Sequence, residues 1–299
     1  MSAAAAASLG DAYRRTLKPG QVETLLDAVF FRPMAFVVVK LALPTPITPN
    51  MLTLASIGAG LAGAYFLRSP TPRDAAIGAG LMIAYGVLDC ADGQLARARG
   101  TSSRLGRILD GASDYIVGVT SGAALGARLG DELGGPGALL AVAGVASVLA
   151  QGTLFDHFKN RYLTRSGAAY REGDDLDETL AAIEALRERV RDGAGVGASA
   201  SLGLHHVYAT FLRVQKLASG DAPAPTTPAA AAAYARAVGP VAKGWAYLGP
   251  STHVALLAGA LVSGRLVEYV WIRVTAGNAA TLALLWLQRG RERDAAGVA

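Results

Sequence analysis

Six stretches of this chain are apolar and long enough to cross a lipid bilayer, and this restricts the fold more than any other feature. They cover residues 51–67, 75–95, 105–129, 137–157, 252–262 with flanks, and 266–287. Only 17% of the 299 residues are charged, whereas a soluble domain carries about 25%. Backbone groups inside a bilayer must bond to one another, so the sequence predicts an all-α integral membrane protein with six transmembrane helices.

The basic residues predict how these helices are oriented. With both termini cytoplasmic, 23 of the 28 Lys and Arg residues fall in cytoplasmic segments. We therefore interpret the net charge of +5 as a sign of membrane orientation, and we expect no nucleic-acid partner. The single cysteine, Cys90, excludes a disulfide within the chain and is expected to be a packing residue.

The remaining segments complete the predicted organisation. Residues 1–21 are expected to be a flexible N-terminal tail, and residues 22–47 an interfacial amphipathic helix followed by a proline-rich elbow. Residues 48–158 and 247–288 form the six-helix bundle in this interpretation. Residues 159–246, between spans four and five, are expected to be a cytoplasmic helical insertion, because 177–191 and 205–217 have helical periodicity. Residues 289–299 are expected to be a C-terminal tail.

Four carboxylates interrupt the second and third spans. Asp89 and Asp92 are three residues apart, and Asp110 and Asp114 are four apart, so each pair shares one helical face. If the two spans are antiparallel helices joined near residues 100–101, the pairs face each other at equal depth. Ionised acids at membrane depth are costly. The pattern therefore predicts a bound divalent cation, for which carboxylates are suitable hard ligands.

The residues around these acids favour phosphate binding. Gly93 and Ala96 lie one turn after the first two aspartates and leave that face of the helix open. Gly106 and Ser103 extend the corresponding stripe on the next helix. Arg97 and Arg99 are expected to present guanidinium groups to phosphate at the mouth of the site.

The string D-x2-D-G-x2-A-R-x8-G-x3-D-x3-D, which covers residues 89–114, resembles the signature of the CDP-alcohol phosphotransferase family at every fixed position. The resemblance implies a membrane transferase in phospholipid biosynthesis. It would move a substituted phosphate from a CDP-linked donor to an acceptor hydroxyl and release CMP. The resemblance also implies two Mg²⁺ or Mn²⁺ ions, a site at the cytoplasmic face of the bacterial inner membrane, and a homodimer.

Roles follow from the resemblance position by position. Asp89, Asp92, Asp110 and Asp114 would bind the metal ions, and Asp114 would also be the general base. The donor would be contacted by the elbow and by both helices of the hairpin, at Thr48, Pro49, Asn50, Asp92, Gly93, Ala96, Arg97, Ser103 and Gly106.

The acceptor is left open by the sequence. Lys159 and Arg161, just after span four, and Arg273, inside span six, are candidate acceptor-binding residues. The donor is either CDP-diacylglycerol with an alcohol acceptor, or a CDP-linked headgroup with a lipid or polyol-phosphate acceptor, as in synthases that use inositol phosphates. Two alternatives of other classes are a divalent cation transporter, because intramembrane acids also line ion paths, and a membrane scaffold without enzymatic activity.

Overall fold

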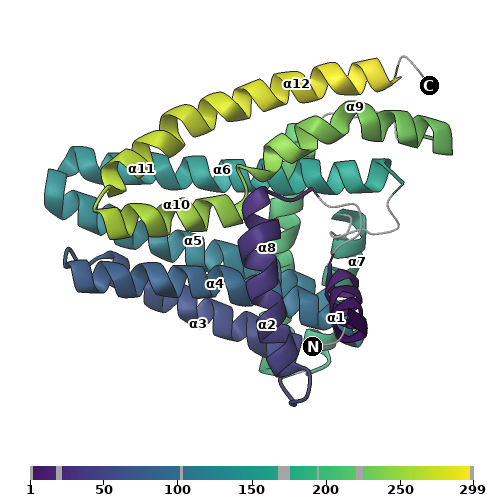
Figure 1. Ribbon diagram of the computed structural model, residues 1–299, viewed down its shortest axis with the longest axis horizontal. Helices are drawn as coiled ribbons and strands as arrows, with labels where there is room; N and C mark the ends of the chain where they lie inside the picture. The colour runs from purple at the N-terminus through teal and green to yellow at the C-terminus, as the bar shows by residue number, and fades with distance from the viewer. Residues whose placement is uncertain are drawn as a thin grey trace.

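The computed structural model describes residues 3–17, 22–101, 104–167, 176–193, 195–219 and 225–296, and these residues form only helices and connecting turns. Figure 1 shows their arrangement. The elements in chain order are α1 (Ala3–Thr16), the π-helical turn η1 (Asp27–Phe31), α2 (Arg32–Ala42), α3 (Pro49–Leu67), α4 (Pro72–Arg99), α5 (Arg104–Leu133), α6 (Gly135–Arg165), α7 (Leu176–Arg191), α8 (Val196–Ser219), α9 (Pro228–Ala246), α10 (Pro250–Ser263), α11 (Leu266–Ile272), the π-helical turn η2 (Arg273–Gly277) and α12 (Asn278–Ala296).

Five helical segments within the described residues are long and apolar enough to cross a membrane: 49–67, 72–99, 135–165, 228–263 and 266–295. They overlap five of the six predicted spans, although the segment 228–263 begins well before the predicted span at 252–262. The described residues are therefore those of a helical integral membrane protein. The predicted span 105–129 lies in α5, a 30-residue helix that is not among the five. The first turns of α5 include side chains that lie outside the described residues, so its status as a sixth span stays a prediction.

The core of the bundle is built on α3. This helix packs against both α4 and α5, while α6 packs against α5 and α10 packs against α4. Small residues allow the close approach. A Cβ at Gly60 of α3 would lie 2.5 Å from a methyl carbon of Val117 in α5, and a Cβ at Gly63 would lie 3.1 Å from Met82 in α4. Helices in lipid associate through such close packing, so α3 holds the two acid-bearing helices in place.

The helix formed by η1 and α2 crosses the long helices at a steep angle (Figure 1). One of its faces carries large apolar side chains that no part of the described protein covers; Leu25 and Leu41 are both 70% exposed, and Val37 is 53% exposed. The opposite face buries Ala35 and Val39 against α4. An exposed apolar stripe on a transverse helix is what the predicted interfacial helix requires.

The polar segments differ in part from the expectation. Residues 3–16, expected in a flexible tail, form α1, and the side chain of its last residue, Thr16, is buried. Helices α7 and α8 match the two predicted helices of the insertion and pack on each other. Helix α9 instead packs on α6 and α12 and leads through a short turn into α10. Helix α12 also continues to Ala296, through most of the predicted C-terminal tail.

Candidate functional site

The acids of the motif lie on α4 and α5, which are joined by a tight turn. Helix α4 ends at Arg99, and Gly100 adopts the left-handed conformation (φ 65°) that favours glycine. The amide of Thr101 then donates to the Ala96 carbonyl at 2.9 Å. The predicted turn at residues 100–101 is therefore confirmed. It brings the part of α4 that carries Asp89 against the part of α5 that carries Asp114, as the hydrogen bonds below show.

Asp92 is the most buried of the acids whose side chains are described, at 5% exposed. Its Oδ2 accepts a hydrogen bond from the hydroxyl of Thr53 on α3 at 2.5 Å. An ionised carboxylate is stabilised by such a donor in a site with little water. A third helix therefore contributes to the environment of Asp92.

Two hydrogen bonds join α4 to α5 at the level of the deeper acids. The Tyr85 hydroxyl on α4 donates to Oδ1 of Asp114 at 2.5 Å, and the Ser113 hydroxyl on α5 lies 3.5 Å from Oδ1 of Asp89. Tyr85 is 5% exposed and Ser113 is fully buried. These contacts place Asp89 and Asp114 at similar depth on facing helices, as the spacing predicts.

The oxygen atoms of this region suit a hard divalent cation. Carboxylates of Asp89, Asp92 and Asp114 and the nearby hydroxyls are the ligand types that Mg²⁺ and Mn²⁺ prefer. Among the described side chains, no group of three or more potential ligands gathers closely enough to hold a metal ion. The side chain of Asp110 and the whole of Ser103 lie outside the described residues. A complete set of metal ligands would therefore need Asp110. Metal binding is for this reason part of the function proposed below.

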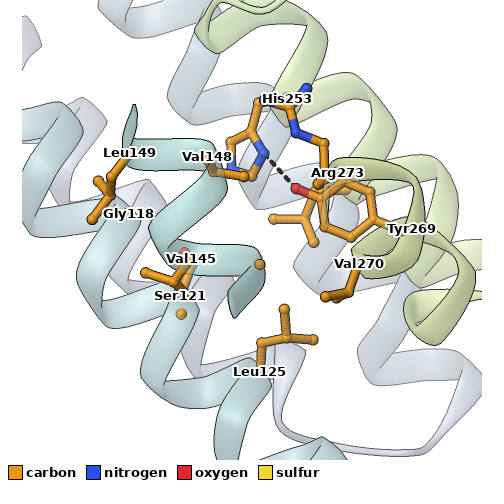
Figure 2. A pocket seen from close by; sticks show the side chains of 13 residues that line it. Gly118, Ser121, Leu125, Val145, Val148, Leu149, His253, Tyr269, Val270 and Arg273 are labelled. Atoms are coloured by element: carbon orange, nitrogen blue, oxygen red, sulfur yellow. Dashed lines mark hydrogen bonds between the residues drawn. The ribbon is translucent and has the colours of Figure 1, made fainter. Parts of the chain in front are cut away.

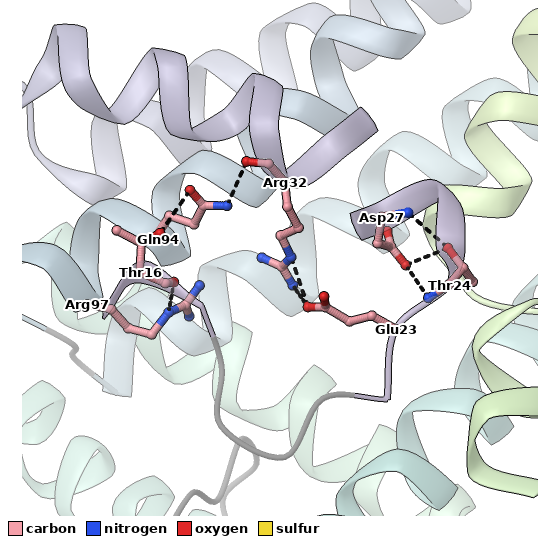
Figure 3. A network of polar contacts seen from close by, with 7 residues as sticks. All are labelled: Thr16, Glu23, Thr24, Asp27, Arg32, Gln94 and Arg97. Atoms are coloured by element: carbon pink, nitrogen blue, oxygen red, sulfur yellow. Dashed lines mark hydrogen bonds and ion pairs between the residues drawn. The ribbon is translucent and has the colours of Figure 1, made fainter. Parts of the chain in front are cut away.

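Arg97, the expected phosphate ligand, contacts the N-terminal helix. Its Nε donates to the carbonyl of Thr16, the last residue of α1, at 2.6 Å (Figure 3). Its guanidinium also lies over Gly93, where a Cβ would come within 3.3 Å of Nη1. Gly93 therefore makes room for the Arg97 side chain, a role that sequence reasoning did not identify.

The same network fixes α1 and η1–α2 to α4. The Gln94 side chain is fully buried, and its amide nitrogen donates to the Arg32 carbonyl at 3.1 Å. The guanidinium of Arg32 in turn pairs with Glu23 at 2.8 Å (Figure 3). The last two turns of α4 are thus held by polar contacts on the side of α1 and α2.

Arg99, also expected to contact phosphate, bonds to the backbone of the elbow. Its guanidinium donates to four backbone carbonyls where α2 ends and the elbow turns, at distances from 2.5 to 3.3 Å; the acceptors are Ala42, Leu43, Thr45 and Ile47. Ala42 is the last residue of α2, so these carbonyls lie at or just beyond the end of a helix. Arg99 therefore fixes the elbow, and its expected contact with phosphate stays a prediction.

The elbow leads directly into α3. The hydroxyl of Thr48 accepts from the Met51 amide at 3.3 Å, and Pro49 occupies the first helical position, so both act as a start signal for α3. Asn50 follows in the first turn. The three residues therefore lie at the same end of the bundle as Arg97.

Two of the candidate acceptor residues have protein partners. The Nζ of Lys159 lies 3.3 Å from Oδ1 of Asp156 and over the Phe155 ring. Arg161 forms an ion pair with Glu292 of α12 at 2.9 Å, and both side chains are almost fully buried. These contacts favour a structural role for Arg161.

Arg273, the third candidate, lines a small cavity between α5, α6, α10 and α11. The cavity has a volume of about 30 Å³ and mostly apolar walls. At its polar end, Tyr269 and His253 share a hydrogen bond beside Arg273 (Figure 2). None of the described lining residues is acidic. Gly118, which lines the opposite wall, lies one turn from Asp114 on α5.

The π-helical turn η2 directs Arg273 toward this cavity. Gln151 of α6 donates to the Arg273 carbonyl at 3.1 Å and to the Asn278 side chain at 2.9 Å. Gly277 allows this approach, because a Cβ there would lie 2.7 Å from the Gln151 amide. The guanidinium is 3% exposed and reaches the Leu248 carbonyl at 3.5 Å. Such turns are frequent at functional sites.

Comparison with known families bears on this arrangement. Residues 46–159 match the model of the CDP-alcohol phosphatidyltransferase family, and this segment includes all four aspartates and the Thr48–Asn50 turn. No curated protein sequence matches the chain. The match confirms the resemblance seen in the aspartate motif. The family implies a membrane transferase that takes phosphoalcohol or phosphatidyl groups from CDP-alcohols in lipid synthesis.

Proposed function

We propose that this membrane protein, whose residues 46–159 match the CDP-alcohol phosphatidyltransferase family, transfers a substituted phosphate from CDP-diacylglycerol or another CDP-alcohol to an acceptor hydroxyl, with release of CMP. The observation that carries the proposal is the four-aspartate motif on α4 and α5 within the matched segment. The basic residues support a site on the cytoplasmic side of the membrane.

All four acids would bind metal in this proposal, and one of them would also act as the general base. Asp89, Asp92, Asp110 and Asp114 would hold one or two Mg²⁺ or Mn²⁺ ions, which would stabilise negative charge on the phosphoryl oxygens. Asp114 would take the proton of the acceptor hydroxyl. For that task its carboxylate must be ionised and within hydrogen-bond reach of the hydroxyl.

The donor would bind where α1, the elbow and the turn between α4 and α5 meet. Arg97 would exchange the Thr16 carbonyl for a phosphate oxygen, which is a stronger acceptor for a guanidinium. Thr48, Pro49 and Asn50 would contact the nucleotide from the start of α3. Gly93, Ala96, Ser103 and Gly106 would allow the donor to approach the backbone of the two helices.

An anionic acceptor, such as a polyol phosphate, is favoured by Arg273. Its charge is buried, and water screens a buried charge weakly. The cavity that it lines is small and has mostly apolar walls. Arg273 would therefore attract the acceptor through its charge, while the acceptor itself lies nearer Asp114.

The test is CMP release by the purified protein in lipid nanodiscs. CDP-diacylglycerol and CDP-linked alcohols would each be offered with a panel of alcohols and polyol phosphates, in Mg²⁺ or Mn²⁺. We expect release that requires the metal and is lost in Asp92→Asn, whereas Asp131→Asn, at the opposite end of the bundle, keeps it. Divalent metal flux into liposomes without CMP release would instead support the transporter.

A further inference from the structure

Two hydroxyl groups outside the aspartate motif contact its carboxylates. Thr53 on α3 donates to Oδ2 of Asp92, and Tyr85 on α4 donates to Oδ1 of Asp114, each at 2.5 Å. Both residues are almost completely buried, Thr53 at 2% and Tyr85 at 5% exposed. Both hydroxyls thus lie within hydrogen-bond distance of an acid of the motif.

We infer that Thr53 and Tyr85 are positioning residues, which fix the carboxylates of Asp92 and Asp114 in the orientations that metal binding and proton transfer need. The inference rests on the proposed function. Neither residue belongs to the motif, and Thr53 comes from a helix that carries none of its acids.

Each contact engages one oxygen of its carboxylate. A carboxylate otherwise rotates about its last side-chain bond, and its broad torsional preference does not fix the plane. One donated hydrogen bond selects a plane, and an ionised acceptor makes this bond strong. Groups that support metal ligands or catalytic acids in this way typically change affinity or activity by about 10–100-fold when they are removed.

The Thr53 hydroxyl has a choice of acceptors. Its oxygen lies 2.5 Å from Asp92 and 3.2 Å from the Pro49 carbonyl, and it has one proton to donate. The carboxylate is both nearer and a stronger acceptor, so the hydroxyl donates its hydrogen bond to Asp92. Pro49 begins α3, one turn before Thr53. The contact with Asp92 is therefore made by the first turns of α3, directly after the elbow.

Packing keeps Thr53 at this distance. The Gly60 and Gly63 contacts described above bring α3 close to α5 and α4 along the same helix. The backbone of Thr53 cannot move away from Asp92 without a shift of α3 as a whole. The bundle thus holds the backbone from which the hydroxyl reaches Asp92.

The experiment separates the hydroxyl from the shape of each side chain. Thr53→Val and Tyr85→Phe remove the hydroxyl and keep the volume, and Thr53→Ser keeps the hydroxyl. Tyr115→Phe is the matched control, because Tyr115 is next to Asp114 in the chain but its hydroxyl pairs with Thr153 at 3.2 Å. Thr53→Ala replaces Thr53→Val if the latter lowers the unfolding temperature of the purified protein by more than the control does.

Two readouts are measured. Binding of Mn²⁺, followed by electron paramagnetic resonance without substrates, should weaken about 10–100-fold in Thr53→Val and stay within about threefold in Thr53→Ser. In Tyr85→Phe, kcat at saturating Mn²⁺ should fall about 10–100-fold, while the donor KM stays within about threefold. Tyr115→Phe should match the wild type.

The results that overturn the inference are equally specific. Wild-type Mn²⁺ affinity in Thr53→Val, equal loss in Thr53→Ser, or wild-type kcat in Tyr85→Phe would each refute the corresponding positioning role. If the wild type itself releases no CMP from any CDP-linked donor, the proposed function fails, whereas the Mn²⁺ titrations still test Thr53.

Discussion

The ion pair between Arg161 and Glu292 offers a quantitative test of whether Arg161 supports the fold or binds the acceptor. The two side chains join α6 to α12 at 2.9 Å, with exposures of 7% and 11%. Glu292 also accepts hydrogen bonds from Tyr234 at 3.3 Å and from Gln288 at 2.9 Å. A charge in this position has little contact with water once its partner is removed.

The expected magnitude follows from this burial. Removal of one member of a buried ion pair costs about 3–5 kcal/mol, because it leaves the other charge without compensation. In Arg161→Met, the donors Tyr234 and Gln288 remain, so we expect the lower end, about 3 kcal/mol. The double variant Arg161→Met/Glu292→Leu removes both charges and leaves these donors without an acceptor. It should cost only about 1–2 kcal/mol.

The assay is reversible unfolding in mixed micelles with increasing SDS, for the wild type, both single variants and the double variant. The double variant should be more stable than either single one. A matched pair of variants at the exposed ion pair between Arg68 and Asp131 should change stability by less than about 1 kcal/mol. The reasoning is refuted if Arg161→Met leaves stability unchanged and raises the acceptor KM, because Arg161 would then bind the acceptor.

Three further predictions follow from the site and the fold. Asp114→Asn should keep nucleotide binding, measured by calorimetry with CDP, and lose turnover; CMP release at the wild-type rate would exclude the assignment of the base. Arg99→Ala should raise the donor KM about tenfold with little change in kcat, since the elbow loses a donor to four carbonyls, worth about 1.5 kcal/mol or more; an unchanged KM would contradict this. Val37→Glu with Leu41→Glu should weaken the association of an isolated 22–43 peptide with vesicles in a flotation assay, whereas wild-type binding would count against an interfacial helix.

The hairpin was predictable because its signals are local. Helical spacing places the acids in pairs, and the glycine at the turn sets their relative depth. The proline-rich elbow was equally clear, because proline restricts its own and the preceding residue. These features need no knowledge of distant contacts.

The contacts of individual polar side chains were not predictable in the same way. Arg99 bonds to carbonyls about 50 residues earlier, and a backbone acceptor leaves no trace in the sequence. Thr53 and Tyr85 were missed because their partners lie on other helices and share no spacing with them. Arg161 was a candidate acceptor-binding residue, because the local sequence does not indicate that α12 extends far enough to bring Glu292 against it.

The segment boundaries show a similar limit. The alanine-rich start was expected to be a flexible tail, but the last turn of α1 makes tertiary contacts with Gln94 and Arg97. The segment that forms α9 was expected to be part of the cytoplasmic insertion, although it is apolar. Its packing on α6 and α12 depends on the position of the C-terminal helix, which the local pattern does not specify.

Anomalous X-ray scattering from crystals soaked in Mn²⁺ tests the central claim most directly. The account predicts a strong manganese peak between α4 and α5, in contact with Asp92 and lost in Asp92→Asn. The account would be contradicted by crystals that show no manganese between these helices although the same preparation, with the same concentration of Mn²⁺, releases CMP.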